Sequence, residues 1–293
     1  MSKNAITAQS GPVVVTGSGG FIGSHIVLNL VKRGYQVRAC VRDASNEVNN
    51  AHLKSMNQIG PGSVELYSCD MMLAGAYDTV FRGAAAVFHA AAEMGNLEGS
   101  TPMKVYEGGV EATRLVIDSI KRSESVKRLV YTSSFAAVGH PCEEGYCYTE
   151  DSWADMNQEL RREGSQWSME VVSRNREVAY AMTKVESERL VYSEADANGF
   201  EAFGACPCHV IGPVLSAGHQ RPWAWQTRIG DMLEGVGHRR MFWNIVDVRD
   251  VAEAQVLIAE NTENYSGQRY NLVATDESGL INQERLQAIL QDL

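Results

Sequence analysis

The chain has 293 residues, of which 44% are hydrophobic and 21% charged, so it can bury a sizeable core and general disorder is excluded. The 36 acidic residues outnumber the 26 basic ones and give a formal net charge of −10. This balance argues against nucleic acid and against an anionic membrane as partners. No apolar run can span a bilayer, no signal-peptide pattern opens the chain, and the six cysteines are scattered. We therefore expect a cytoplasmic protein with free thiols.

Strand-like apolar runs alternate with helix-length periodic segments through most of the chain. The predicted strands are Val13–Val15, Tyr35–Val41, Val64–Cys69, Ala84–His89, Val126–Thr132, Glu201–Cys208 and Arg269–Val273. The predicted helices are Phe21–Lys32, Val48–Gln58, Val105–Ile120, Glu177–Ala197, Val246–Asn261 and Asn282–Leu290. Strands separated by helices imply βαβ units and a parallel sheet. The order predicts an α/β fold with a doubly wound, Rossmann-type sheet.

The regular alternation of predicted strands and helices stops after residue 211, which suggests two structural parts. We expect a dinucleotide-binding Rossmann domain over 1–211, resumed by 246–274. Residues 212–245 carry tryptophan and proline without a clear βαβ period, and with 275–293 they would form a smaller substrate lobe. The polar connection over 140–176 predicts loops and short helices.

A glycine cluster follows the first predicted strand directly. Gly17, Gly20 and Gly23 form the pattern G-x-x-G-x-x-G, and Phe21 and Ile22 open the predicted helix. The first glycine permits a tight turn, the second lets the backbone approach a pyrophosphate, and the third lets the helix pack close to the sheet. The helix N-terminus offers N–H groups and a positive dipole to phosphates. The setting predicts a dinucleotide site rather than a purely structural turn.

The second predicted strand ends Val41-Arg42-Asp43, at the position that separates NAD from NADP binding. An acidic residue there binds the ribose diol of NAD, whereas an arginine can pair with the 2′-phosphate of NADP. Arg42 stands at the tip of the strand, and Arg38 lies on the same strand face. This favours NADP, while Asp43 keeps NAD possible. The alternative is that both arginines are solvated at a strand edge.

Tyr180 and Lys184 are four residues apart at the start of the long predicted helix, so their side chains share one face. A cation there stabilises tyrosinate and lowers the pKa of the phenol toward working pH. The fifth predicted strand ends Thr132-Ser133-Ser134, where a serine hydroxyl can hydrogen-bond a substrate carbonyl. A lone Tyr-x-x-x-Lys is a common accident on a solvated helix. Behind a glycine-rich loop, we interpret it as the catalytic group.

These motifs together resemble the extended short-chain dehydrogenase/reductases. Finer matches resemble dihydroflavonol 4-reductases, cinnamoyl-CoA reductases and the related microbial ketone and aldehyde reductases. The segments that carry this likeness are Gly34–Asp43, Asp70–Asp78, Gly83–His89, Asp151–Trp153, Pro207–Pro213 and Val246–Ala252. The resemblance covers nearly the whole chain.

The resemblance implies a role for each matched residue. Tyr180 is the proton donor and acceptor, Lys184 tunes it and holds the nicotinamide ribose, and Ser134, rather than Ser133, polarises the carbonyl. The cofactor supplies the hydride. Besides Tyr180, Lys184 and the glycine-rich loop, the implied cofactor contacts are Arg42, Asp70, Met71, Ala90, Ala91, Ala92, Thr132, Pro207 and Val210.

The resemblance also implies, by position in the sequence, which residues line the substrate pocket. Its expected residues are Met94, Phe135, Gly139, His209 and Trp223. Gly139 stands where dihydroflavonol reductases carry an Asn that binds substrate hydroxyls, which argues against a flavonoid. Gly109 stands where many extended members carry an Asn on the helix after the fourth strand. The tryptophans of 212–245 either line an aromatic pocket or belong to the core. Because relatives continue beyond Leu293, we expect the substrate lobe to be incomplete at its C-terminus.

We therefore expect an enzyme that reduces a hydrophobic or aromatic ketone or aldehyde with NADPH, as a monomer or a homodimer. A sugar-nucleotide epimerase or dehydratase and a 3β-hydroxysteroid dehydrogenase are alternatives on the same scaffold. A non-catalytic, dinucleotide-sensing protein is an alternative from another class, against which Tyr180 and Lys184 argue. The cysteines lack metal-ligand spacing, so no metal is expected. The expected partner is a small carbonyl or alcohol substrate.

Overall fold

The computed structural model describes residues 4–92, 100–139, 147–154, 169–219, 230, 245–276, 279–280 and 288–289. At its centre is a seven-stranded sheet in the order β3-β2-β1-β4-β5-β6-β9, with every neighbouring pair parallel. The strands are β1 (Val13–Thr16), β2 (Gln36–Val41), β3 (Ser63–Ser68), β4 (Ala86–His89), β5 (Arg128–Thr132), β6 (Glu201–Pro207) and β9 (Arg269–Leu272). The strand order reverses between β1 and β4. The carboxyl ends of these two strands therefore border the crevice in which such sheets bind ligands.

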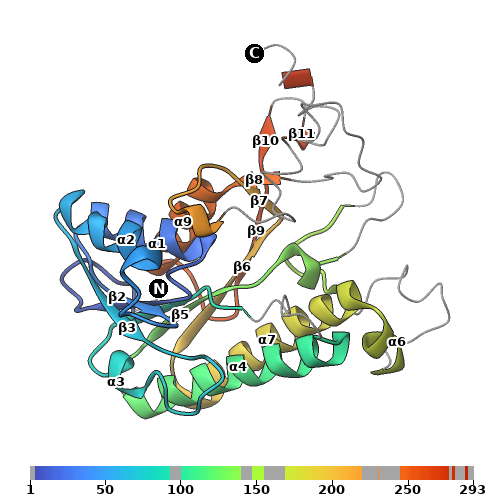
Figure 1. Cartoon of the computed structure of the whole chain (residues 1–293). Coiled ribbons are helices and arrows are strands. Elements are labelled where there is room, and N and C mark those ends of the chain that lie inside the picture. Colours follow the sequence, from blue (N-terminus) through green and yellow to red (C-terminus); the bar gives the residue numbers. More distant parts are fainter. Residues whose placement is uncertain are drawn as a thin grey trace.

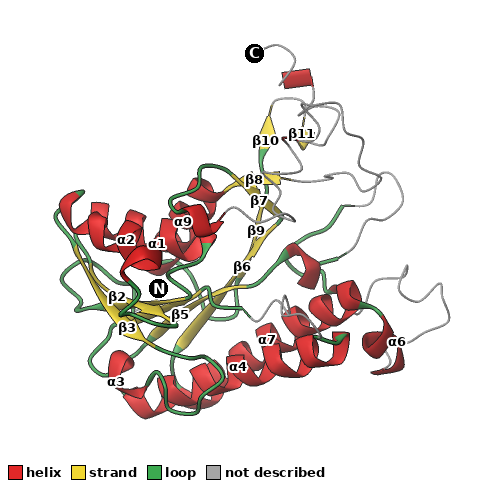
Figure 2. Cartoon of the chain, viewed as in Figure 1, coloured by secondary structure: helices red, strands yellow, loops and turns green. Residues whose placement is uncertain are grey.

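Helices cover both faces of this sheet (Figures 1 and 2). One face carries α1 (Phe21–Lys32), α2 (Glu47–Ser55) and α9 (Val248–Glu260). The other carries α3 (Asp78–Phe81), α4 (Pro102–Ser123) and α7 (Arg176–Asn198), and α4 and α7 lie side by side. The doubly wound α/β fold predicted from the sequence is confirmed.

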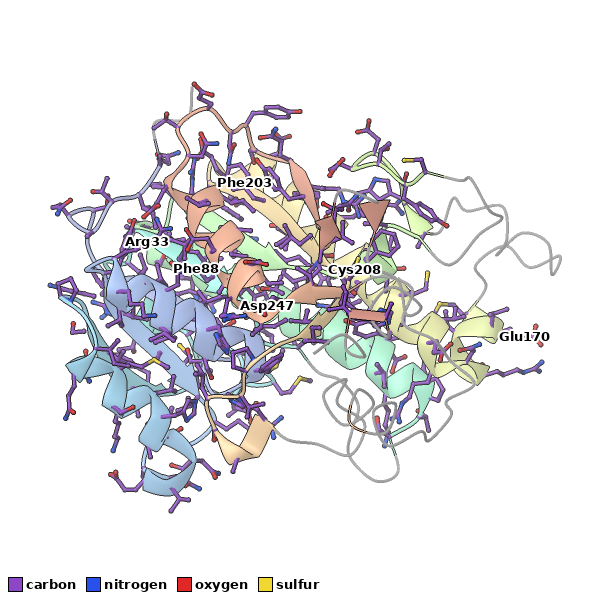
Figure 3. The ribbon with its side chains drawn as sticks, turned by 90° about the horizontal axis from the view of Figure 1, so that it is seen from above. Arg33, Phe88, Glu170, Phe203, Cys208 and Asp247 are labelled. Atoms are coloured by element: carbon purple, nitrogen blue, oxygen red, sulfur yellow. The ribbon has the colours of Figure 1, made fainter. Side chains whose placement is uncertain are left out.

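Two apolar cores fill the space between the sheet and its helices. Val13 and Val15 of β1 belong to the first core, with Phe88 of β4 and Phe203 of β6 (Figure 3). Val14 belongs to the second core, beneath α4 and α7. Alternate residues of one strand thus serve opposite faces, as the period of two requires. All three valines are 0% exposed, which explains why the strand reads as a continuous apolar run.

Capping residues set where the two long helices begin. The side chain of Thr101 caps α4, and Pro102 takes its first position. The side chain of Asn175 accepts the N–H groups of Glu177 and Val178 and so caps α7. Such caps satisfy donors that the first turn of a helix leaves unpaired. They fix the start of the helix that carries Tyr180 and Lys184.

The helix predicted over 246–261 is shorter than expected. Ile245–Asp247 form β8, which pairs in parallel with β7 (His209–Ile211), and α9 follows it. The side chain of Asp247 accepts the N–H of Arg249 at 2.8 Å and caps the helix. A three-residue strand next to an apolar periodic helix leaves no break in the hydrophobic pattern, so the sequence merges the two.

Short elements complete the described part of the chain. They are α6 (Met169–Arg174), β10 (Thr275–Asp276), β11 (Gly279–Leu280), and the 3-10 helices η1 (Met56–Gln58), η2 (Phe135–Ala137) and η4 (Ala217–His219). α6 lies in the connection for which short helices were expected. The helix predicted over 282–290 lies outside the described residues, except for 288–289. No described helix is both long enough and apolar enough to cross a membrane.

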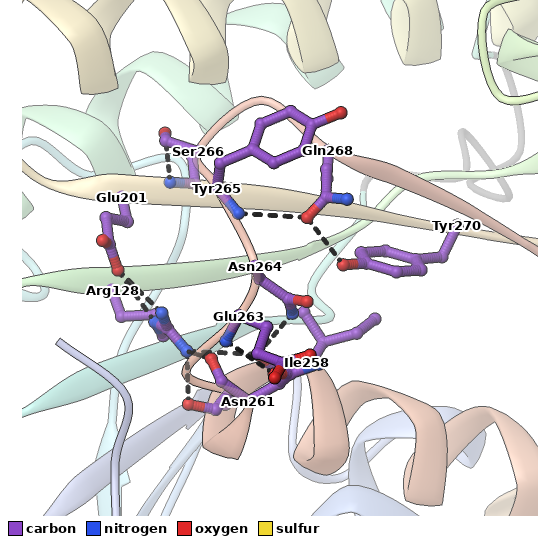
Figure 4. A network of polar contacts seen from close by, with 12 residues as sticks. Arg128, Glu201, Ile258, Asn261, Glu263, Asn264, Tyr265, Ser266, Gln268 and Tyr270 are labelled. Atoms are coloured by element: carbon purple, nitrogen blue, oxygen red, sulfur yellow. Dashed lines mark hydrogen bonds and ion pairs between the residues drawn. The ribbon is translucent and has the colours of Figure 1, made fainter. Parts of the chain in front are cut away.

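A buried arginine ties the beginnings of β5 and β6 to the end of α9 (Figure 4). Arg128 is 0% exposed and donates to the carboxylate of Glu201 at 2.8 Å. The same guanidinium donates to the carbonyl oxygens of Ala259 at 2.7 Å and Asn261 at 3.0 Å. The buried charge is therefore both paired and hydrogen-bonded. These contacts lie at the amino ends of the strands, opposite to the ligand-binding crevice at their carboxyl ends.

Candidate active site

The glycine-rich loop joins β1 to α1 and is packed too closely to accept side chains. Gly17 has a φ of +66°, and a Cβ atom on it would lie 2.7 Å from the backbone of Ala91. A Cβ atom on Gly23 would lie 2.8 Å from the carbonyl carbon of Gly17. Gly20 provides no side-chain cap to α1, whose first turn holds no acidic residue. The N–H groups of that turn, which include those of Phe21 and Ile22, therefore suit the phosphates of a dinucleotide.

The carboxyl ends of β1 and β4 are joined behind this loop. Nδ1 of His89 lies 2.7 Å from Oγ1 of Thr16, and the N–H of Ala91 donates to the same oxygen at 3.2 Å. Burial, and then the positive charge of Lys184, lower the pKa of His89 to about 3, so the ring is neutral. These contacts hold the half-buried Ala90 and Ala91 and the exposed Ala92 at the edge of the crevice.

The described beginning of the 212–245 segment packs against the helix side of the loop. Nε2 of His219 in η4 lies 3.2 Å from the carbonyl oxygen of Gly19. Nε2 of His25 in α1 lies 2.9 Å from the carbonyl oxygen of Pro213, and Leu215 packs on the first core. The glycine-rich loop is therefore held on both of its sides.

Arg42 and Asp43, at the end of β2, are both exposed but differ in their contacts. The carboxylate of Asp43 accepts the N–H of Ser45 at 2.9 Å and its hydroxyl as well, and these bonds lower the pKa of Asp43. Within the part of the chain that the structure describes, no hydrogen bond or ion pair holds Arg42. Arg38 donates to two carbonyl oxygens at the end of α3, at 2.8 and 2.7 Å. Arg38 thus binds the end of α3, whereas the side chain of Arg42 makes no such contact with the described residues.

A small pocket brings several predicted residues together from distant parts of the chain. They are Met71, Ala91, Ala92, Tyr180 and Lys184. The lining is completed by Gly109, Thr113, Tyr131 and Thr183. Asp70, which precedes Met71, is exposed, and its carboxylate accepts the N–H of Met72 at 2.9 Å. The ends of β3 and β4 therefore meet the helix α7 at this pocket.

Ser134, Tyr180 and Lys184 form what we call the catalytic cluster. The side chain of Ser134 faces the phenol of Tyr180 and lowers its pKa. Nζ of Lys184 donates to the carbonyl oxygen of Thr132 at 2.9 Å. The same Nζ lies 6.0 Å from the centre of the Tyr180 ring and 5.1 Å from that of Tyr131. The three predicted catalytic side chains therefore lie at one place, where the end of β5 faces α7.

Burial shifts both titratable groups of the cluster toward their neutral forms. It raises the pKa of Tyr180, and the side chain of Ser134 acts in the opposite direction. Lys184 is 5% exposed, and burial lowers its pKa to about 8 although the carboxylate of Glu188 opposes the shift. Near neutral pH the cluster therefore holds a protonated phenol beside an ammonium group. That is the form needed to give a proton to a substrate oxygen.

An aromatic pair stands next to Ser134. A Cβ atom on Gly139 would overlap the ring of Tyr148. Tyr148 packs edge-on against Phe135 of η2, with ring centres 5.5 Å apart and an interplanar angle of 89°. The ring of Tyr148 thus fills the space that an Asn at position 139 would take in a dihydroflavonol reductase.

Gly109 has a packing role of the same kind. It lies where α4 meets α7, and a Cβ atom on it would overlap the methyl group of Thr183. Thr183 is 5% exposed, and its hydroxyl donates to the carbonyl oxygen of Ala179 at 2.8 Å. An Asn at this position would push the two helices apart, which accounts for the glycine.

The remaining predicted residues lie at the end of β6, in β7 or outside the described part of the chain. Pro207 ends β6 and is buried, and His209 and Val210 are half-buried in β7. Met94 and Trp223 lie outside the described residues.

Sequence reasoning missed Glu188, which lies one helical turn beyond Lys184. Glu188 is 0% exposed, accepts the hydroxyl of Ser133 at 2.6 Å, and pairs with Arg269 at 2.8 Å. The repeat of four residues from Tyr180 through Lys184 to Glu188 is the signal that could have found it. Arg269 had no such signal, because it is 81 residues away along the chain.

A family profile described as the NAD dependent epimerase/dehydratase family matches residues 13–272. The chain belongs to this family. A dihydroflavonol 4-reductase of Hordeum vulgare is 29% identical over 260 residues, which cover 87% of this chain and 69% of the relative. One of Solanum lycopersicum is 30% identical over 206 residues, which cover 70% of this chain and 51% of the relative.

Solved structures of reductases share the fold. Gre2 of Candida albicans in complex with NADPH has a TM-score of 0.77 and 23% identity, over 96% of this chain and 82% of that one. Yeast methylglyoxal/isovaleraldehyde reductase Gre2 with NADPH has a TM-score of 0.72 and 24% identity, over 90% and 78%. The vestitone reductase of alfalfa, Medicago sativa, has a TM-score of 0.71 and 22% identity, over 96% and 81%.

The predicted membership of the extended short-chain dehydrogenase/reductases is confirmed, and so is the class of NAD(P)-dependent oxidoreductase acting on CH-OH or carbonyl groups. The glycine-rich loop, the uncapped start of α1 and the pocket beside Tyr180 fit a nicotinamide dinucleotide.

Proposed function

We propose that this enzyme reduces a hydrophobic or aromatic ketone or aldehyde to an alcohol, reversibly, and that it prefers NADPH to NADH. The observation that carries the proposal is the catalytic cluster, of which Tyr180 and Lys184 line one pocket with Ala91 and Ala92. A phenol that faces a serine hydroxyl and lies near a buried ammonium group can protonate a developing alkoxide.

Each member of the cluster has a separate task in this reaction. The bound cofactor would supply the hydride. The hydroxyl of Ser134 orients the substrate carbonyl, and Oη of Tyr180 gives its proton to the oxygen that becomes the alcohol. The ammonium group of Lys184, held by the carbonyl oxygen of Thr132, stabilises the tyrosinate that remains. In the reverse direction the tyrosinate accepts the proton of the alcohol.

The preference for NADPH rests on the contrast at the end of β2. The carboxylate of Asp43 is bound by Ser45, whereas the exposed Arg42 is not held by the described residues. We assign Arg42 to the 2′-phosphate, and Asp70 and Met71 to the edge of the adenine. The glycine-rich loop and the start of α1 would hold the pyrophosphate.

The preference for an apolar substrate rests on the surroundings of Ser134. Phe135 and Tyr148 form an aromatic pair beside it, and both belong to an apolar cluster with Val138 and Cys206. The curated relatives are dihydroflavonol 4-reductases, and one structural neighbour is a methylglyoxal/isovaleraldehyde reductase. Aryl ketones, aldehydes and keto esters are therefore the substrates to try first, with a dihydroflavonol beside them.

The test is loss of absorbance at 340 nm with NADPH and NADH in parallel against that panel, with wild type and Tyr180→Phe. We expect turnover that is faster with NADPH. Tyr180→Phe should lose about 10²–10⁴-fold in kcat, because it removes the proton donor, yet bind NADPH with unchanged affinity.

Two results would contradict the proposal. Full activity of Tyr180→Phe would exclude the assigned proton donor. Tight NADPH binding by wild type without turnover of any carbonyl compound would favour a sugar-nucleotide epimerase or a dinucleotide sensor.

A further inference from the structure

Three side chains of α7 meet the end of β5 one after another. They are spaced by four residues and therefore share one face of the helix. The pairs are Tyr180 with Ser134, Lys184 with the carbonyl of Thr132, and Glu188 with Ser133. We call them the three helix-to-strand contacts. The first two belong to the catalytic cluster, and the third lies directly beneath it.

We propose that Glu188 is a positioning residue for the reductase reaction: its bond to Ser133 fixes the end of β5 against α7, and its charge stabilises the ammonium group of Lys184. Ser133 lies between Thr132 and Ser134 in the chain, so a bond that holds it also holds the two residues that contact Lys184 and Tyr180. This inference rests on the proposed function.

The carboxylate of Glu188 is itself rigidly held. Oε1 accepts Nε of Arg269 at 2.8 Å and the hydroxyl of Tyr192 at 2.7 Å. Oε2 accepts the hydroxyl of Ser133 at 2.6 Å and Nη2 of Arg269 at 3.3 Å. Both members of the ion pair are buried, with side chains 4% exposed for Arg269 and 0% for Glu188. A carboxylate with this many donors keeps one orientation and can act as a fixed point for Ser133.

Arg269 also binds the segment 147–154 and so connects it to the carboxylate of Glu188. Its Nη1 donates to the carbonyl oxygens of Glu150 and Ser152. Its guanidinium lies 3.8 Å from the centre of the Trp153 ring, and that of Arg189 lies 4.7 Å from the same ring. The segment that brings Tyr148 to the substrate side of the site is thus tied to the same ion pair.

The charge of Glu188 bears on Lys184 because both are buried one turn apart. The charged and titratable groups around the two are Tyr180 and Tyr192 on α7, His89 on β4, Tyr131 on β5, Cys206 on β6 and Arg269 on β9. Glu188 raises the pKa of Lys184 against the effect of burial. Loss of this carboxylate would also leave Arg269 as an unpaired cation in the same region. Both changes favour the neutral amine.

Five proteins separate the positional effect from the effect of charge. Glu188→Gln removes the charge, Glu188→Asp retains it on a shorter side chain, and Ser133→Ala removes the link while leaving the charge. Glu188→Gln/Arg269→Gln restores neutrality to the pair. Glu201→Gln is the matched control. It removes the charge from the ion pair with the buried Arg128, which lies at the amino ends of β5 and β6, away from the catalytic cluster.

Two measurements are made on each protein. The first is kcat for carbonyl reduction between pH 6 and 10. The second is the titration of Lys184 without cofactor, followed by NMR of protein labelled with [ε-¹³C]lysine, in which Lys184→Arg identifies the signal. Thermal unfolding shows which variants are folded.

We expect Glu188→Gln to lose about tenfold or more in kcat and to shift the alkaline loss of activity and the Lys184 titration to lower pH by about one unit. The double variant should recover part of that shift. Glu188→Asp should lose activity at the same alkaline pH as wild type. Ser133→Ala should have a lower kcat, but its pH profile and its Lys184 titration should not shift. Glu201→Gln should lower only the unfolding temperature.

An unchanged Lys184 titration in a folded Glu188→Gln, or an equal shift in Glu201→Gln, would overturn the inference. If Glu188→Gln does not fold, a Ser133→Ala variant with wild-type kcat overturns it equally. If wild type reduces no carbonyl compound, the proposed function fails, and the NMR titration then decides the role of Glu188 by itself.

Discussion

The ring of Tyr148 stands where a Cβ atom on Gly139 would lie. Gly139 is buried and follows η2 by two residues, so the absence of its side chain lets the segment 147–154 approach the strand end that carries Ser134. Tyr148 in turn packs on Phe135. A single glycine thereby decides which side chain packs beside Phe135 and Ser134.

Gly139→Ala should displace Tyr148 and destabilise the protein by about 1–3 kcal/mol, the usual cost of overpacking. We also expect KM for aromatic substrates to change more than kcat. Urea unfolding and steady-state kinetics measure both effects. In the background of Tyr148→Ala the same substitution should be nearly neutral. Gly218→Ala is the control, since its Cβ atom would meet only Oγ of Ser216, at 3.7 Å.

The rate of reduction should fall as pH rises through about 8. The pKa of Lys184 is lowered to about 8, so the ammonium group that stabilises tyrosinate is present below this pH and lost above it. Lys184→Arg should be slower overall but should show no decline near pH 8, because its guanidinium stays charged. A decline at the same pH in both proteins would assign the titration to another group.

The same shift has a consequence for stability with the opposite sign. Between pH 8 and the ordinary lysine value of 10.5, the unfolded chain binds more protons at this residue than the native state does. The contribution of Lys184 to the free energy of unfolding therefore rises with pH across this window. Urea unfolding at pH 8 and 10 tests this: the free energy of unfolding of wild type minus that of Lys184→Met should become more positive at the higher pH.

Arg42→Ala should raise KM for NADPH by about tenfold or more and leave KM for NADH nearly unchanged, because a charge-assisted bond to the 2′-phosphate is lost. Asp43→Ala should have a small effect on both cofactors, since the carboxylate serves Ser45. A larger loss with NADH in Asp43→Ala would instead assign this carboxylate to the ribose.

Arg128→Met should lower the free energy of unfolding by about 3–5 kcal/mol, because it removes a buried cation that pairs with Glu201 and donates to the carbonyl oxygens of Ile258, Ala259 and Asn261. Lys54→Met breaks the exposed pair with Glu47 and should cost under about 1 kcal/mol. Urea unfolding of both variants provides the comparison. Equal decreases in the free energy of unfolding would show that burial does not determine how much these ion pairs stabilise the protein.

The sequence predicts those parts of the fold in which local chemistry and tertiary structure agree. Apolar runs, and for β2 an alternation with period two, predicted the seven strands of the sheet, and the glycine pattern placed Gly17 and Gly23 at the turn into α1. Strand ends and helix spacing then brought Ser134, Tyr180 and Lys184 to one place. These residues follow from periodicity and from the topology of a parallel sheet.

Other features of the fold and of the site depend on contacts that no local sequence pattern predicts. The guanidinium of Arg38 turns to α3, although its strand position is compatible with a phosphate. β7 and β8 are too short to interrupt the hydrophobic period around them. Tyr148 lies in a polar connection, and although Gly139 was expected at the substrate pocket, no pattern placed the ring of Tyr148 against it. In each case no motif in the sequence marks the contact.

The contacts that fix the catalytic cluster have a consequence for folding. Lys184 and Thr132 are 52 residues apart, Glu188 and Ser133 are 55 apart, and Arg269 and Glu188 are 81 apart. Closing such loops has an entropic cost that only the assembled sheet can offset. No fragment of the chain can therefore hold the cluster in working geometry. Recovery of activity during refolding should follow the slowest step of tertiary assembly, after the helices have formed.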